Sequence, residues 1–145
     1  MERDSQIFVG LMIDHPYSRT VTHLDNLLAT LGSLNTAQVH FNVVKAQGLL
    51  DSSFSERLVV GSCVLSIVTG LASAGWGSPF LKEISLERMR ISTPLYAGDT
   101  VSARSEVIEV NEIDKKRTRV RSVTTGINQR DEVLLVVVRN FEVER

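Results

Sequence analysis

Apolar residues recur at helical spacing in the first half of the chain. The pattern predicts a helix that begins at a Thr22–Asp25 capping box, with Asp in place of the usual Glu, and that ends at Gly32. Its apolar positions are Leu24, Leu27, Leu28 and Leu31. Residues 33–42 then read as a loop or short turn, and Val43–Gly48 as a second short helix.

The strongest helix prediction covers residues 61–74. Its apolar stripe consists of Val64, Leu65, Val68, Leu71 and Ala72, and most of its other positions are small. A helix that is apolar or small nearly all round is usually buried. We therefore expect this segment to form the central helix of the fold.

The second half alternates apolar and polar residues, which is typical of strands. The segments are 84–91, 100–110, 117–127 and 132–143, separated by polar turns. Short turns between successive strands predict an antiparallel meander. The continuous apolar run Leu134–Val138 predicts a central strand covered on both faces.

These elements predict an α+β fold in which the helix from Gly61 lies across the concave face of the sheet. No repeat or linker divides the chain, so residues 1–145 are interpreted as a single domain. An open sheet leaves edge strands exposed, and pairing of two sheets edge to edge would cover them. We expect a homodimer or a larger homo-oligomer.

Composition narrows the choice of partner and compartment. The formal net charge of -1 offers no basic excess for a nucleic acid. The apolar-rich stretch 58–74 is interrupted by Gly, Ser and Thr and is too short for a membrane span, and the charged start Met1–Asp4 leads into no signal peptide. The single cysteine, Cys63, reads as a small core residue. A cytoplasmic protein without a membrane partner is expected.

The candidate chemistry lies in the loop segment Asn35–His40. Histidine titrates near neutral pH, so His40 can accept and donate a proton. Asn35 has a donor and an acceptor with which to orient a water molecule. The plainer alternative is an exposed or hydrogen-bonded structural histidine, which is how His15 and His23 are interpreted. No metal-ligand spacing is present, so no metal is expected.

Gly61 is the second candidate, because it precedes the predicted central helix. Free backbone N–H groups at a helix start can polarise a carbonyl group and stabilise negative charge that develops on its oxygen. The alternative is that Gly61 only permits a tight turn or close packing.

The order of several motifs resembles that of the MaoC-like acyl-CoA dehydratases, a hot-dog-fold group, and most of all the clade that includes mesaconyl-CoA hydratases. The resemblance covers nearly the whole chain from Phe8 onward. It is carried by residues 19–22, 25–26, 35–42, 57–61 and 89–100. It implies a long helix wrapped by a curved antiparallel sheet, and dimers with acyl-CoA near their interface.

The resemblance also implies a reaction and its residues. The reaction is reversible syn addition of water to an enoyl-CoA, with the CoA thioester as substrate and no further cofactor. His40 matches the family histidine and Gly61 the glycine whose N–H faces the thioester oxygen. Thr69 falls where a hydroxyl residue helps to position the family acid, and Asn35 replaces that acid, an Asp.

The replacement by Asn35 leaves three hypotheses open, because an amide cannot accept a proton as a carboxylate does. The first is a hydratase or dehydratase of a short, branched or dicarboxylic enoyl-CoA, with His40 as the sole proton-transfer group. The second is an acyl-CoA thioesterase, and the third a non-catalytic acyl-CoA-binding protein. Asp25 is a possible substitute carboxylate, although its place at a helix start favours capping.

Overall fold

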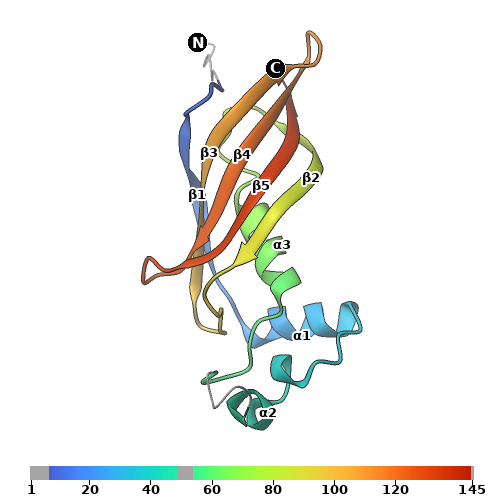
Figure 1. Ribbon diagram of the computed structural model, residues 1–145, viewed down its shortest axis with the longest axis vertical. Coiled ribbons are helices and arrows are strands. Elements are labelled where there is room, and N and C mark those ends of the chain that lie inside the picture. The colour runs from blue at the N-terminus through green and yellow to red at the C-terminus, as the bar shows by residue number, and fades with distance from the viewer. Residues whose placement is uncertain (1–6, 49–53, 145) are drawn as a thin grey trace.

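Five antiparallel strands curve around one central helix in the computed structural model, which describes residues 7–48 and 54–144 (Figure 1). The strands are β1 (Met12–Thr20), β2 (Phe80–Ile91), β3 (Thr100–Glu112), β4 (Arg117–Ile127) and β5 (Val133–Glu144), in the order β1-β3-β4-β5-β2. The helices are α1 (His23–Gly32), the 3-10 turn η1 (Gln38–His40), α2 (Val43–Gly48) and α3 (Gly61–Leu71). The predicted α+β arrangement is confirmed. Residues 1–4, used above to argue against a signal peptide, lie outside the described residues.

The helices of the first half begin where the sequence predicts. Thr22 and Asp25 form the capping box of α1, with hydrogen bonds in both directions between side chain and backbone. The short helix α2 has the predicted bounds. The central helix α3 ends at Leu71 rather than at residue 74. The chain leaves the helix there and passes through Gly75, whose φ of +89° favours glycine.

One strand was missing from the sequence prediction. β1 pairs with β3, but its register shifts between Asp14 and Ser18, where Pro16 lies. The bulge interrupts the alternation that identifies a strand. β1 is an edge strand, where a proline costs no ladder hydrogen bond to a second neighbour.

The predicted meander is correct for β3, β4 and β5 and wrong for β2, which pairs with β5 instead of β3. Residues 92–99 therefore connect two distant strands. The predicted turn at Gly98–Asp99 packs against the end of β1, because Gly98 N–H donates to the Val21 carbonyl and Val21 N–H to the Asp99 carbonyl, both at 2.8 Å. β5 is an interior strand as predicted, although its Val136 and Val138 side chains are only half-buried.

The core lies between α3 and the concave face of the sheet. Val64 and Val68 of α3 are fully buried there, and Cys63 is buried in the same cluster, which confirms its core role. Burial of α3 on all sides is not confirmed, because Ser62, Ser66 and Gly70 are exposed. These small residues face outward because the single sheet covers only one side of the helix.

Close approach of α3 to the sheet depends on a glycine of β4. A Cβ atom at Gly126 would lie 2.3 Å from Cγ2 of the fully buried Val68. We expect Gly126→Ala to lower the free energy of unfolding by about 1–3 kcal/mol, the usual cost of overpacking a core. Urea denaturation measures it. Gly70→Ala is the matched control, because its new Cβ meets nothing within 4 Å, and an equal loss there would contradict the explanation.

A series of hydrogen-bonded, buried polar side chains joins β1 to the segment after α3. The His15 ring donates from Nδ1 to the Ala74 carbonyl (2.6 Å), and its Nε2 lies 2.8 Å from Ser105 Oγ, which contacts Thr124 Oγ1 at 2.8 Å. His15 therefore has the structural role predicted for it. Burial lowers its pKa, and Arg139 adds to this, although the Ala74 carbonyl and Asp14 oppose it.

The lowered pKa of His15 predicts a loss of stability in mild acid. Because the unfolded chain binds the proton more readily, stability falls once the pH drops below about 6.5, the ordinary histidine value, and continues to fall toward the folded pKa. Urea unfolding at a series of pH values between 8 and 5 should show a smaller slope in His15→Gln than in the wild type. The exposed His23→Gln serves as control and should keep the wild-type slope.

Candidate functional site

His40 lies at the end of η1 and is half-buried. Its Nδ1 is 2.9 Å from the carbonyl oxygen of Leu58. Since a carbonyl can only accept, Nδ1 carries a proton, and in the neutral ring Nε2 has the free lone pair. No described residue contacts Nε2 by a hydrogen bond. His40 is therefore arranged as a proton acceptor at Nε2.

Asn26 joins the His40 turn to the entry of α3, and sequence reasoning did not identify it as a functional residue. Its side chain is 5% exposed. Nδ2 donates to the His40 carbonyl at 2.6 Å and to the Leu58 carbonyl at 3.4 Å, while Oδ1 accepts from the Val60 N–H at 2.9 Å. In the sequence, Asn26 is marked only as a polar residue inside a predicted helix whose regularly spaced positions are otherwise leucine.

Gly61 is the first residue of α3, three residues after the carbonyl that binds the His40 ring. Among the described residues, none accepts a hydrogen bond from its N–H. Its φ is not in the left-handed region, so a tight turn does not require glycine here. A Cβ would instead lie 2.7 Å from Ile91 Cδ1 of β2. Glycine thus leaves space beside a free N–H at a helix start.

Asn35 uses its side-chain oxygen locally. Oδ1 accepts from the Ala37 N–H at 2.9 Å, which forms an Asx turn into η1, and the Asn35 N–H donates to the Thr30 carbonyl at 3.0 Å. Among the described residues, none accepts from Nδ2. The side-chain group of Asn35 that can bind a water molecule is therefore the Nδ2 amide, which is a donor.

Thr69 is the predicted site residue least connected to the others. Its hydroxyl donates to the Leu65 carbonyl (2.8 Å) and the Ser66 carbonyl (3.4 Å) of its own helix. It makes no hydrogen bond to Asn35 or His40 within the described part of the chain. The structure therefore brings His40 and Gly61 together around residues 58–60, places Asn35 upstream on the same loop, and leaves Thr69 two turns along α3.

Asp25, the possible substitute carboxylate, caps α1. Partial burial opposes its ionisation, but hydrogen bonds from the Thr22 N–H and hydroxyl and the charge of Arg19 outweigh it and lower the pKa of Asp25. Its oxygens accept from Thr22 N, Thr22 Oγ1 and Arg19 Nη2. A carboxylate used in this way is a weak proton acceptor.

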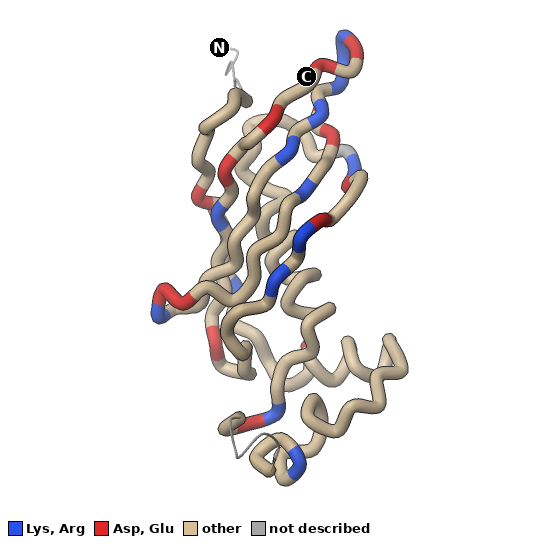
Figure 2. Tube along the Cα trace, in the orientation of Figure 1, with Lys and Arg blue, Asp and Glu red and all other residues tan. Residues whose placement is uncertain are grey.

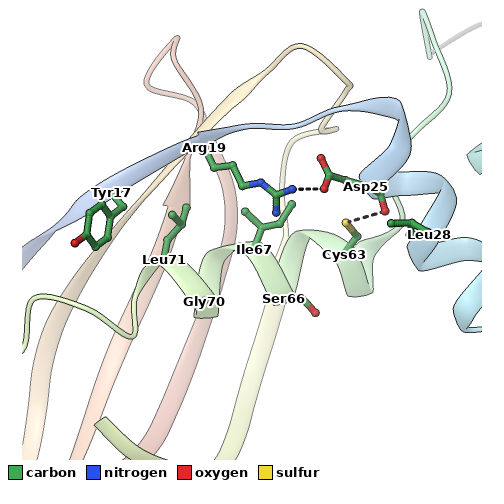
Figure 3. A pocket seen from close by; sticks show the side chains of 9 residues that line it. All are labelled: Tyr17, Arg19, Asp25, Leu28, Cys63, Ser66, Ile67, Gly70 and Leu71. Carbon is green, nitrogen blue, oxygen red and sulfur yellow. Dashed lines mark hydrogen bonds and ion pairs between the residues drawn. The ribbon is translucent and has the colours of Figure 1, made fainter. Parts of the chain in front are cut away.

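A groove of about 380 Å³ runs along α3 on the side of β1 and α1 (Figure 3). The Arg19–Asp25 ion pair closes one part of its wall, and apolar side chains form most of the rest. His40, Asn35, Gly61 and Thr69 do not line it. The lining residues are Tyr17, Arg19, Asp25, Leu28, Cys63, Ser66, Ile67, Gly70 and Leu71.

Charge is scarce around the candidate site. Asp25 is the only Asp, Glu, Lys or Arg residue in α1 and α3, whereas the strands carry many of both signs (Figure 2). Within residues 7–48 and 54–144, no three His, Cys, Asp or Glu side chains gather as a metal site, and no helix has the length and hydropathy of a membrane span. Outside these two helices, the Glu56–Arg57 ion pair directly precedes Leu58, whose carbonyl binds the His40 ring.

Residues 6–129 match the family described as the MaoC like domain. The chain belongs to the MaoC-like dehydratase family. The resemblance found in the sequence is therefore confirmed for the family, while the roles of individual residues stay predictions.

Two relatives from bacteria have named activities. Beta-methylmalyl-CoA dehydratase from Chloroflexus aurantiacus is 34% identical over 122 residues, which cover 81% of this chain and 33% of that protein. Mesaconyl-CoA hydratase from Cereibacter sphaeroides is 34% identical over 101 residues, covering 70% of this chain and 27% of that protein. The MaoC-like chain thus matches about a third of the length of these relatives.

Solved structures confirm the hot-dog fold. Monoamine oxidase regulatory protein from Archaeoglobus fulgidus aligns with a TM-score of 0.81 at 25% identity, covering 96% of this chain and 92% of that one. The (R)-hydratase from A. caviae aligns with a TM-score of 0.68 at 20% identity, covering 93% and 96%. A Mycobacterium tuberculosis protein with a double hot-dog fold aligns at 0.80 with 14% identity, covering 95% and 42%. The last two likenesses concern the fold alone.

Proposed function

We propose that this MaoC-like chain adds water reversibly to the double bond of an enoyl-CoA, with His40 as the proton-transfer group. The observation that carries the proposal is the Nδ1–H hydrogen bond from His40 to the Leu58 carbonyl, which leaves the Nε2 lone pair free near the start of α3. A base and a helix N-terminus are the two groups that conjugate addition to a thioester requires.

The proposed hydration moves one proton. His40 Nε2 takes a proton from water as the water oxygen forms a bond to the β-carbon. The C=C electrons shift to the thioester oxygen, where the Gly61 N–H stabilises the enolate. The imidazolium then returns its proton to the α-carbon, which restores the neutral histidine. Asn35 Nδ2 donates to the attacking oxygen and so holds it in place.

The relatives support a substrate class. Both named relatives act on CoA thioesters of short dicarboxylic acids. We therefore favour a short dicarboxylic or branched C4–C5 acyl group for this chain. We also propose a homodimer, because the edge strand β2 exposes apolar side chains. They are Ile84, Leu86, Met89 and Ile91.

Replacement of His40 tests the reaction. We expect His40→Ala to lower the kcat/KM for hydration of crotonyl-CoA or mesaconyl-CoA by about 10²–10⁴-fold, because general base catalysis is lost. The decrease in enoyl absorbance measures the rate, and circular dichroism checks the fold. The control His23→Ala removes an exposed histidine and should keep the wild-type rate. A folded, fully active His40→Ala variant would exclude the proposal.

Replacement of Asn35 tests how the water is held. Asn35→Asp keeps the acceptor for the Ala37 N–H but loses the Nδ2 donor. We expect kcat to fall by roughly fivefold, the effect of one hydrogen bond of about 1 kcal/mol. Asn42→Asp is the matched control, because Asn42 Oδ1 likewise accepts from a backbone N–H, that of Lys45. An inert wild type together with an active Asn35→Asp variant would instead indicate an acyl-CoA-binding protein.

The same reactions distinguish hydration from thioester hydrolysis. A thioesterase needs a base beside the thioester carbonyl, and the Asp25 carboxylate is held by Thr22 and Arg19. A thiol reagent in a parallel assay detects free CoA. Release of CoA from a saturated acyl-CoA, which has no double bond to hydrate, would favour the thioesterase.

A further inference from the structure

The two proposed reactive groups sit on different segments of the chain. His40 ends η1, whereas Gly61 begins α3, and the 20 residues 41–60 lie between them. Hydrogen bonds between the two segments, and not only the chain that connects them, therefore bear on their relative position.

We propose that Asn26 is the positioning residue that sets the His40 imidazole relative to the first N–H groups of α3. This role for catalysis rests on the function proposed above. One buried side chain donates to the His40 and Leu58 carbonyls and accepts from the Val60 N–H. Asn26 thus contacts the residue that carries the base and the residue that precedes Gly61.

The Leu58 carbonyl links this network to the ring itself. It accepts from His40 Nδ1 at 2.9 Å and from Asn26 Nδ2 at 3.4 Å. The Leu58 N–H in turn donates to the Val39 carbonyl at 3.0 Å. The position of Asn26 therefore fixes the acceptor that orients the imidazole and selects its tautomer.

Only an amide of this length satisfies the three backbone groups. An aspartate could accept from the Val60 N–H but would place a negative charge against two carbonyl oxygens. A leucine of similar volume would leave one N–H and one carbonyl without a partner in a buried position. The chemistry of the network, and not only its volume, requires asparagine.

Contacts at both the first turn of α1 and its Asp25 carbonyl hold the helix that carries Asn26. The capping box fixes its first turn, and the Asp25 carbonyl accepts a weak hydrogen bond from Cys63 Sγ at 3.8 Å. Thr30, one turn beyond Asn26, is 2% exposed, but its hydroxyl bonds only to the Asn26 and Leu27 carbonyls of its own helix. Thr30 is therefore a buried polar residue of α1 that does not reach the His40 turn.

The test compares Asn26→Asp and Asn26→Leu with the matched control Thr30→Val. The two Asn26 variants disconnect the His40 turn, whereas Thr30→Val removes a buried hydroxyl from the same helix and leaves the network intact. With an enoyl-CoA that the wild type hydrates, we expect kcat to fall about 10²-fold in the Asn26 variants with little change in KM. A displacement of about 1 Å at the reacting groups has an effect of this size.

The pH dependence of Asn26→Asp separates positioning from general damage. Burial beside two carbonyl oxygens raises the pKa of the new carboxyl group. Once protonated, that group can donate to one carbonyl while it accepts from the Val60 N–H, as the amide does. The kcat of Asn26→Asp relative to the wild type should therefore rise as the pH is lowered from 8 to 6. A ratio that stays constant would overturn the proposal.

Nitrogen NMR of the His40 ring gives a readout that needs no activity. In the wild type and in Thr30→Val, the ¹⁵N shifts should show a proton on Nδ1, and in Asn26→Leu they should show a mixture of tautomers. If Asn26→Leu does not fold, Asn26→Asp at pH 8 replaces it in this comparison. An unchanged tautomer in the folded Asn26 variant would refute the positioning role. Failure of His40→Ala to lose activity would refute the proposed function alone.

Discussion

Packing of α3 against the concave face of the sheet determines where the candidate functional groups lie. The helix comes close because β4 has a glycine opposite Val68, where any side chain would collide. This contact sets the position of the helix start, and with it the free N–H of Gly61. The other groups reach that point through hydrogen bonds to the backbone just before α3, so their geometry depends on the same core contact.

Buried polar side chains connect the irregular segments to this core. Asn26 binds the backbone around His40 and Val60, and His15 binds the segment that follows α3. In both cases one side chain supplies hydrogen bonds that the backbone of a loop or bulge does not obtain from a regular element. These groups restrict the loops strongly because an unmatched partner in a buried position is costly.

The sequence predicted the elements better than their pairing. The helices and the four strands of the second half follow from periodicity and capping, which are local properties. The strand containing Pro16 was missed because its bulge removes the alternation, and the partner of β2 was wrong because pairing depends on contacts far apart in the chain. The candidate site divides in the same way. His40 and Gly61 could be found from residue type and motif order, whereas Asn26 becomes visible only when three distant backbone groups meet its side chain.

The surroundings of His40 explain how one ionisable group could serve the proposed reaction. Asn35 and Asn26 are amides, and Asp25 is occupied as a cap, so none of them competes for the proton. Hydration moves a single proton from water to the α-carbon. In a syn addition, the course that the family resemblance implies, both positions lie on one face of the double bond. A lone imidazole with one free nitrogen can therefore reach both, provided that its ring stays fixed against the Leu58 carbonyl while the proton is transferred.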